Sequence, residues 1–467
     1  MVERDEGNRP SLGNPPALLI DLYELTMAQS YLAEGMQATA TFSLFVRSLP
    51  PNRSYLVAAG LPDVVSYLEN LHFDRSDLDY LRSTRLFRDD FLDYLSRLHF
   101  HGDLWAMPEG TLFFANEPVL EVTAPIVEAQ LAETYLLNQV HFQSLITAKA
   151  ARSVLAAQGR PVIDFALRRT YGTDAGLKVA RDSYLAGFEA TSNVLAGKLF
   201  GIPIVGTMAH SYIEAFPHEV DSFRAYARTY PERTVLLVDT YDTLSGTRKA
   251  ALVAHEMERA GHVLRAVRLD SGDAIALSRQ VRAVLDAEGL TYVKIMASGG
   301  WDEYSIEEAV EQRAPIDTFA VGTKLGVSAD APFSDMAYKL VAYDGHPVAK
   351  LSLGKATWPG AKQVYREFDS GGHMLRDVLA LREEAAPSAG TPLLVPVMKQ
   401  GRLVTSLPTL SQARERLQGQ LAALPQRQRR LRDAEPFPVQ LSPGLRALSN
   451  ELARRLRTEE VAGEQAR

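Results

Sequence analysis

The 467-residue sequence contains no cysteine. The chain can therefore form no disulfide bond, no thiolate metal site and no cysteine nucleophile. A run of about 18 apolar residues is also missing, so we expect no membrane span and no membrane partner. The opening stretch MVERDEGNRPSLGNPP lacks the apolar segment of a signal peptide. These absences lead us to expect a cytoplasmic protein.

An excess of basic residues is absent as well. The formal net charge is −7, and we expect no nucleic-acid partner because domains that bind nucleic acid usually present a basic face. An acidic protein can still bind an anionic substrate where basic groups converge in one cleft. The sequence also lacks the G-x-G-x-x-G, Walker A, H-E-x-x-H and G-x-S-x-G motifs.

What the sequence does contain is a repeated pattern of apolar β-type runs, each ending in a polar cluster and followed by a helical pattern. The six runs are 161–169, 202–210, 234–242, 264–273, 292–300 and 317–324, with helices predicted at 181–200, 244–260, 274–288 and 302–313. Near-continuous apolar runs are typical of buried parallel strands, and their alternation with helices predicts βαβ units. We therefore predict an α/β barrel whose chemistry lies at the C-terminal strand ends.

The rest of the chain suggests flanking domains. We expect residues 1–16 to be a disordered lead-in and residues 17–135 to form an α+β domain. The barrel with the active site is predicted at 136–355. Residues 356–467 are predicted to form a C-terminal extension, a hairpin plus helices, that packs back on the N-terminal domain.

Two β-hairpins are predicted outside the strand series. They cover 336–352 and 393–404, with turns at Asp344-Gly345 and Gln400-Gly401. Asp-Gly is a strong signal for a two-residue hairpin turn.

The segment VRLDSGD (267–273) is the strongest single candidate site. Arg268 can clamp an anion or stack on a ring, and Asp270 and Asp273 can hold a metal ion or sugar hydroxyls. The alternative is a helix N-cap beside a surface ion pair. Ser271 or Asp273 is expected to cap the next helix, but a cap needs only one polar residue, so we favour a functional site.

His210 follows a Gly-Thr turn at the presumed active face. A lone histidine is more often structural, yet its position favours general acid/base chemistry or a role as phosphoryl acceptor. The segment VDTYDTLSGT superficially resembles the diphosphoribosyl-binding loop of type I phosphoribosyltransferases. The long barrel-like alternation disfavours that comparison, and Asp239 and Asp242 are interpreted as residues that orient others.

Three further strand ends carry candidate residues. Phe165 precedes a pair of arginines, Arg168 and Arg169, that can neutralise a carboxylate or phosphate. SGG (298–300) and VGTK (321–324) end the last two runs, where barrels often bind phosphate through backbone N–H groups. Lys355 and KQVYR (362–366) are interpreted as basic residues from a later loop.

Taken together, these segments resemble the nicotinate phosphoribosyltransferase family. The resemblance rests on IDLYELTMAQSYL, FALRRTYGTDAGL, FEATSNVLAGKLFGIPIVGTMAHSY, LLVDTYDTLSGT, VRLDSGD, ASGGWDEY, APIDTFAVGTKL and KQVYR, in this order. It implies an irregular TIM-like α/β barrel with an N-terminal α+β domain, and a homodimer with the active site at the subunit interface. The implied reaction joins nicotinate to 5-phosphoribosyl 1-diphosphate, giving nicotinate mononucleotide and pyrophosphate. ATP is the implied co-substrate and Mg²⁺ the implied cofactor.

The resemblance also implies residue roles. Tyr23 and Phe165 would sandwich the pyridine ring, and Arg168 and Arg268 would bind around the base and phosphates. His210 would be phosphorylated by ATP, which improves binding of the diphosphate substrate and drives the reaction. The remaining substrate residues would be Thr207, Ser298, Gly299, Gly322 and Thr323, with the glycines and Thr323 cradling phosphate. Asp270 would contact the ribose or, with Asp273, a metal ion.

Three positions depart from the family pattern. Ile20 stands where the family opening has threonine, and Gly300-Trp301 replace a polar residue and a small aliphatic one. Ser192 lies where the nicotinamide-using relative has an aspartate. A carboxylate there would repel a carboxylate substrate, so Ser192 favours nicotinate.

The sequence bears on three alternative functions. A barrel aldolase or sugar-phosphate isomerase would need a Schiff-base lysine or a glutamate base at a strand end, where only Lys324 is found. A degenerate regulatory paralogue would have lost His210, Arg268 or Asp270, and all three are present. Quinolinate phosphoribosyltransferase needs more cationic groups and is usually much shorter.

Overall fold

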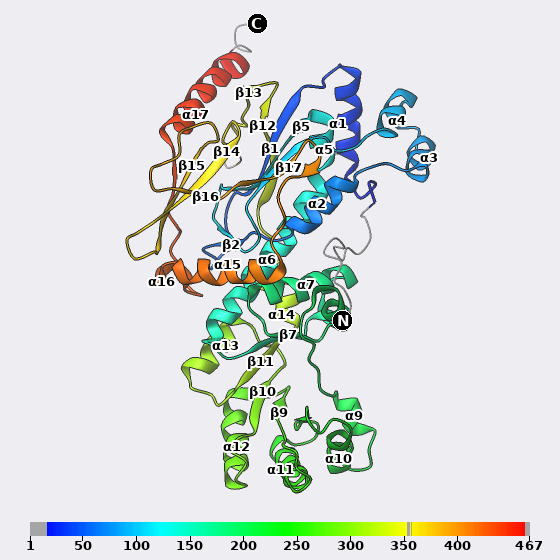
Figure 1. Ribbon diagram of the computed structural model, residues 1–467, viewed down its shortest axis with the longest axis vertical. Coiled ribbons are helices and arrows are strands. Elements are labelled where there is room, and N and C mark those ends of the chain that lie inside the picture. The colour runs from blue at the N-terminus through cyan, green and yellow to red at the C-terminus, as the bar shows by residue number, and fades with distance from the viewer. Residues whose placement is uncertain (1–15, 353–354, 356, 463–467) are drawn as a thin grey trace. The chain divides into compact units, whose positions relative to one another are not determined.

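The computed structural model describes residues 16–352, 355 and 357–462 (Figure 1). The predicted lead-in at 1–16 therefore lies, apart from its last residue, outside the described residues. By its internal contacts the chain divides into two units, one with the described residues up to Leu145 and from Phe333 on, the other Ile146–Pro332. This division is coarser than the predicted domains, whose boundaries stay a prediction.

The second unit is built on a parallel six-stranded sheet. Its strands follow the order β7-β6-β11-β10-β9-β8. They are β6 (Val162–Asp164), β7 (Ala190–Thr191), β8 (Val235–Leu237), β9 (Ala266–Leu269), β10 (Lys294–Ala297) and β11 (Thr318–Val321). Its helices are the 3-10 turn Leu167–Arg169, α7 (Thr173–Ala186), α8 (Val194–Phe200), α9 (His210–Glu214), α10 (Glu219–Thr229), α11 (Thr243–Arg259), α12 (Ala274–Ala287), α13 (Glu303–Glu311) and α14 (Thr323–Gly326).

Five of the six predicted strands are confirmed, whereas the strand predicted at 202–210 is wrong. In that segment only Ile204 makes an isolated parallel bridge, to Thr191, because the segment lies at an open sheet edge and Ile204 is 53% exposed. The edge strand is β7 instead, and it interrupts the helix predicted at 181–200. Gly187, with φ of 120°, ends α7, and the side chain of Asn193 caps α8.

The parallel strands form a half-barrel, with β7 and β8 at its two edges. The barrel prediction is therefore confirmed only in this coarser form, as a mixed α/β fold. The larger core of the unit lies between β8 and β9 and the helices α10, α11 and α12, which lie side by side in Figure 1. A small second cluster, Ile163, Met296 and Ala320, packs against Phe165 and Val205. This smaller cluster reaches the C-terminal strand ends through Phe165.

The first unit contains a seven-stranded antiparallel sheet of order β13-β12-β1-β5-β3-β17-β18. The strands are β1 (Thr39–Val46), β3 (Asp103–Ala106), β5 (Pro118–Pro125), β12 (Met336–Tyr343), β13 (His346–Pro347), β17 (Val395–Lys399) and β18 (Arg402–Leu403). Both predicted hairpin turns are confirmed: φ is 50° at Asp344 and Gln400, and 73° at Gly345 and Gly401. Positive φ at both central residues is the signature of a type I′ turn, whose twist matches that of paired strands.

Two smaller sheets and a set of helices complete this unit. The strands are β2 (Leu56–Val57), β4 (Leu112–Phe113), β14 (Lys362–Phe368), β15 (Met374–Leu381), β16 (Thr391–Pro392) and β19 (Val439–Leu441). The helices are α1 (Leu22–Ala33), α2 (Leu61–Asn70), α3 (Arg75–Ser83), α4 (Asp89–Leu95), α5 (Ile126–Leu131), α6 (Glu133–Ala157, in which the division between units falls), α15 (Leu410–Ala423), α16 (Gln426–Arg429) and α17 (Pro443–Leu456, followed by a π-helical turn, Arg457–Ala462). No helix among the described residues is long and apolar enough to cross a membrane.

The segment KQVYR is not a loop, and this prediction is wrong. It forms β14, which pairs with β15 in an antiparallel hairpin. Lys362 is buried beside Glu121, with Nζ 3.3 Å from Oε1. The Arg366 guanidinium donates two hydrogen bonds to Asp377, at 2.9 and 2.6 Å, and neither side chain is exposed. These basic residues are therefore structural.

We expect Arg366→Met to lower the free energy of unfolding by about 3–5 kcal/mol, because it leaves Asp377 as an uncompensated buried charge. Burial and the charge of Asp377 already raise the pKa of neighbouring Glu117 well above its ordinary value, with Arg366 opposing them. The matched control is Arg75→Met, whose side chain is 97% exposed in its pair with Asp79 and which should cost less than about 1 kcal/mol. Urea unfolding measures both, and equal losses would contradict the expectation.

Candidate active site

The C-terminal ends of the parallel strands meet at one edge of the half-barrel. The register aligns Leu237 of β8 with Arg268 of β9, and Leu269 of β9 with Ala297 of β10. On the other side Val321 of β11 aligns with Asp164 of β6. The loops that follow these strands therefore lie next to one another, and they carry the predicted site residues of this unit.

Arg268 is a buried cation at this edge, 8% exposed. It donates a hydrogen bond to the Thr207 hydroxyl, while its Nε is buried and has no hydrogen-bond partner among the described residues. Burial lowers the pKa of Arg268, and the carboxylates of Asp270 and Asp239 oppose that change. The guanidinium therefore keeps a donor available for an anionic ligand.

Asp239, directly after β8, organises the loop after β9. Its Oδ2 accepts hydrogen bonds from the Asp270 backbone N–H at 2.8 Å and from the Ser271 hydroxyl at 2.6 Å. Its Oδ1 is buried without a hydrogen-bond partner in the described part of the chain. Asp239 thus orients other site residues, as expected. Asp242 instead caps α11 by accepting the Ser245 N–H.

His210 is the first residue of α9 and not the end of a strand. Its Nδ1 lies 3.1 Å from the Thr240 hydroxyl oxygen, and its Nε2 lies 3.7 Å from Oδ2 of Asp270. If Nδ1–H donates to Thr240, Nε2 keeps its lone pair and can act as a base or nucleophile. Thr240 was not predicted as a site residue, although its place in the loop after β8, next to Asp239, was a usable signal.

Asp270 joins the loop after β9 to the loop after β10. Its Oδ1 accepts a hydrogen bond from the Ser298 hydroxyl, and the Ser298 N–H donates to the Leu269 carbonyl at 2.7 Å. Gly299 has φ of 83°, and a Cβ there would lie 2.0 Å from the Asp270 carbonyl oxygen. Only glycine allows the two loops to approach so closely.

The loops after β10 and β11 are joined by Lys324 and Asp302, with Nζ 2.7 Å from Oδ2. Burial acts to raise the pKa of Asp302, but the hydrogen bond from Lys324 helps to lower it below its ordinary value. Trp301, one of the departures from the family pattern, is 6% exposed and packs edge-on against Phe319 with ring centroids 5.0 Å apart. Its side chain thus belongs to the packing behind the loop. The Lys324–Asp302 pair was not predicted, because the two residues are far apart in sequence.

The ends of β6 and β7 carry the third group of predicted residues. Phe165 is half-buried against the small cluster, and Arg168 follows in an exposed 3-10 turn. The charge of Arg168 contributes to lowering the pKa of Arg268, so the two cations face a common region. Ser192 donates its backbone N–H to the Asp164 carbonyl at 2.8 Å, which places it beside this strand end. Gly322 is also close, since a Cβ there would lie 3.0 Å from the Phe165 carbonyl oxygen.

Two other predicted site residues are Tyr23 and Asp273. Tyr23 lies on α1 in the first unit and is 45% exposed; burial, with Glu133 and Glu24, raises its pKa, so it is a neutral phenol. Asp273 is exposed and caps α12 by accepting the Ala276 N–H at 3.0 Å. No group of three or more acidic or histidine side chains suited to a metal ion occurs among the described residues.

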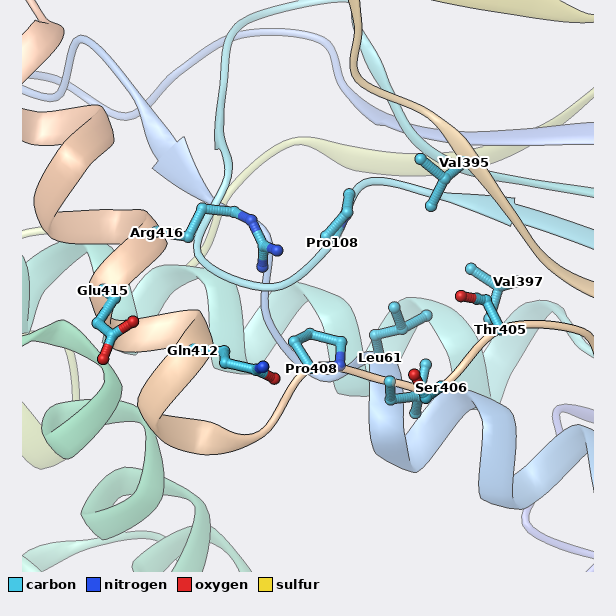
Figure 2. Close-up of a pocket in the computed structure, with 11 residues that line it drawn as sticks. Leu61, Pro108, Val395, Val397, Thr405, Ser406, Pro408, Gln412, Glu415 and Arg416 are labelled. Atoms are coloured by element: carbon cyan, nitrogen blue, oxygen red, sulfur yellow. The ribbon is translucent and has the colours of Figure 1, made fainter.

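A pocket in the first unit holds none of the predicted site residues. It has a volume of about 510 Å³, and Figure 2 shows Gln412, Glu415 and Arg416 extending from one helix with Thr405 and Ser406 on the preceding segment. Arg416 is already used, since it donates a hydrogen bond to the Glu109 carbonyl at 2.7 Å. Pocket volume alone therefore does not identify the reactive edge, which is marked by its converging charges.

The chain is similar to characterised proteins over nearly its whole length. Family models for the nicotinate phosphoribosyltransferase N-terminal domain, family and C-terminal domain match residues 18–141, 161–356 and 386–449. Nicotinate phosphoribosyltransferase pncB2 of Mycobacterium tuberculosis is 53% identical over 91% of each chain. The Bacillus subtilis enzyme of the same name is 38% identical over 91% of this chain and 93% of its own. Human nicotinic acid phosphoribosyltransferase is 31% identical, with a TM-score of 0.82 over 92% of this chain and 99% of the human one.

The two neighbouring glycines of the loop after β10 allow a matched test of the close approach. Gly300 has φ of 78° but open space around it, so Gly300→Ala should lower the free energy of unfolding by about 1–2 kcal/mol through backbone strain alone. Gly299→Ala adds the overlap with the Asp270 carbonyl and should cost about 1–3 kcal/mol more. Chemical unfolding of both variants measures the difference, and equal costs would show that the loops do not touch as described.

Proposed function

We propose that this chain, which belongs to the nicotinate phosphoribosyltransferase family, performs its reaction at the C-terminal edge of the half-barrel. The chain has the activity of that family in NAD biosynthesis. The substrates are nicotinate and 5-phosphoribosyl 1-diphosphate, and the products are nicotinate mononucleotide and pyrophosphate. The observation that carries the assignment to this edge is the convergence of His210, Arg268 and Asp270 there. A degenerate paralogue would have lost at least one of these three residues.

Nicotinate is held by aromatic and cationic groups in this proposal. Phe165 stacks on one face of the electron-poor pyridine ring, and Tyr23 is the residue that the resemblance to the family implies for the other face. Arg168, which is exposed at the end of β6, pairs with the substrate carboxylate. Ser192 leaves that carboxylate without a repelling neighbour, which favours nicotinate over nicotinamide.

The phosphoribosyl diphosphate lies across the loops after β9, β10 and β11. Thr207, Ser298, Gly299, Gly322 and Thr323 surround its phosphate groups through hydroxyl and backbone donors. The pyridine nitrogen forms a bond to C1 of the ribose while the bond from C1 to the pyrophosphate oxygen breaks. The transition state is oxocarbenium-like. The Arg268 guanidinium, whose Nε has no hydrogen-bond partner in the part of the chain that the structure describes, stabilises the charge that develops on the leaving group.

Mg²⁺ fits this arrangement only with substrate oxygens as additional ligands. Asp270 is partly exposed at the edge, whereas Asp273 spends one oxygen on capping α12. Mg²⁺ is commonly bound by one or two carboxylates together with substrate phosphates, and these two residues would hold it. When bound, the ion neutralises charge on the pyrophosphate.

ATP acts through His210 in this proposal. Thr240 holds Nδ1, which leaves Nε2 to attack the γ-phosphorus of ATP. The new N–P bond forms as the bond from phosphorus to the ADP oxygen breaks, so the phosphoryl group passes to the histidine. The phosphohistidine improves binding of the diphosphate substrate, and its later hydrolysis drives the reaction forward.

We also propose a homodimer with the active site at its interface. The support is a set of three exposed apolar side chains of the second unit, one at the first residue of α8 and two in connecting segments. Tyr171 is 81% exposed, Val194 67% and Ile204 53%. Apolar side chains gathered near an active edge are typical of surfaces that another protein covers.

The aldolase alternative is disfavoured by the environment of Lys324. A Schiff-base lysine must be free to lose its proton, and Lys324 is instead paired with Asp302 at 2.7 Å. The quinolinate alternative differs from the proposal in the base that is used, and a product assay distinguishes the two.

A product assay with phosphoribosyl diphosphate and Mg²⁺ tests the choice of base. We expect mononucleotide from nicotinate but not from nicotinamide or quinolinate, and faster formation when ATP is present. Ser192→Asp should raise the KM for nicotinate about tenfold or more through like-charge repulsion, whereas the neutral, similar-sized Ser192→Asn should have a smaller effect. No product from any of the three bases would contradict the proposed function.

His210→Ala tests the ATP step. Without the imidazole no phosphohistidine can form, so we expect ATP hydrolysis to be lost and the KM for phosphoribosyl diphosphate to rise, with residual transfer activity. His255→Ala is the matched control, because His255 lies on α11 with Glu258 as its hydrogen-bond partner. Unchanged ATP coupling in His210→Ala would exclude the phosphohistidine.

A further inference from the structure

Asp164 is a buried carboxylate at the end of β6 that the reaction described above does not use. It is 1% exposed, and it directly precedes Phe165. Burial raises its pKa to about 6, and the hydrogen bonds from Thr191 and Ala166 oppose this rise. Among the described residues no cation contributes to the pKa of Asp164. A buried carboxylate without a cationic partner is costly, so its presence at the active edge calls for a reason.

The two carboxylate oxygens of Asp164 connect two neighbouring segments. Oδ1 accepts the Ala166 N–H at 2.8 Å, which holds the segment that carries Phe165 and Arg168. Oδ2 accepts a hydrogen bond from the Thr191 hydroxyl at 2.7 Å. Thr191 is the last residue of β7 and directly precedes Ser192.

The directions of these hydrogen bonds explain why the residue is an aspartate. The Thr191 hydroxyl oxygen accepts the Asn193 N–H at 3.0 Å, so its own hydrogen is directed to Asp164. An asparagine could accept the Ala166 N–H with its one oxygen, but its NH₂ group would then face a hydroxyl that needs an acceptor. Two acceptor oxygens are required at this place, and only a carboxylate supplies them.

We propose that Asp164 is a positioning residue for the pyridine site, where it holds the Phe165–Arg168 segment and Ser192 at the separation that nicotinate requires. This inference rests on the proposed roles of Phe165, Arg168 and Ser192. Arg268, near the C-terminal end of β9, and Ser298 and Gly299, in the loop after β10, have no hydrogen bond to Asp164 or Thr191 among the described residues, so this part of the diphosphate side is separate from Asp164. Disturbing Asp164 should therefore affect the base and spare the diphosphate.

The test compares steady-state kinetics of Asp164→Asn, Thr191→Val and Thr191→Ser with the unaltered enzyme. Loss of one buried hydrogen bond should raise the KM for nicotinate about tenfold in Asp164→Asn and Thr191→Val. The KM for phosphoribosyl diphosphate and kcat should stay within about twofold, because the loops after β9 and β10 keep their contacts. Thr191→Ser retains the hydroxyl and should behave as the unaltered enzyme.

A purely structural role would lower kcat and raise both KM values together, and that result, or no change at all, would overturn the inference. Should Asp164→Asn fail to fold, the comparison of Thr191→Val with Thr191→Ser decides the question alone. An unaltered enzyme that forms no mononucleotide from nicotinate would overturn the proposed function itself, and this inference with it. An active enzyme whose variants show no difference between the two KM values would overturn only the role of Asp164.

Discussion

The carboxylate of Asp239 is the interaction on which the geometry of the reactive edge depends. It follows β8, and it binds a backbone N–H and a hydroxyl of the loop after β9, so it determines where Asp270 lies. The adjacent Thr240 lies within hydrogen-bond distance of His210. One short segment after β8 thus orients groups from two other loops. The charge of Asp239 also supports the protonated state of Arg268 against burial.

Buried charges support the loops on the opposite side of the edge. Glu303, the first residue of α13, pairs with Lys149 at 2.7 Å and with Arg152 at 3.3 Å, both from α6. Lys149 also pairs with Asp330. Displacement of α13 would leave an uncompensated charge in the interior, which costs several kcal/mol. The loop between β10 and α13 is therefore anchored at its helical end, while its glycines follow the contour of the neighbouring loop.

The apolar alternation predicted most of the half-barrel because β6 and β8–β11 are buried on both faces, which leaves a continuous apolar run in the sequence. The same reasoning failed at 202–210, where the apolar residues lie at an open edge and Ile204 is largely exposed. A different inference failed at KQVYR, where the basic residues suggested an exposed loop. Arg366 is buried there because Asp377, its partner across the β14–β15 hairpin, neutralises it, and Lys362 because Glu121, which is distant in sequence, neutralises it.

The sequence by itself determined which chemical groups stand at the strand ends, because a strand end and the polar residues that follow it are local features of the chain. It also determined the family, through segments that keep their order along nearly the whole chain. Tertiary structure alone decided which of these groups touch. His210 and Thr240 are 30 residues apart, Asp239 and Asp270 are 31 apart, and Asp270 and Ser298 are 28 apart. Their distances follow from the register of parallel strands and the close packing of neighbouring loops, and no local pattern carries that information.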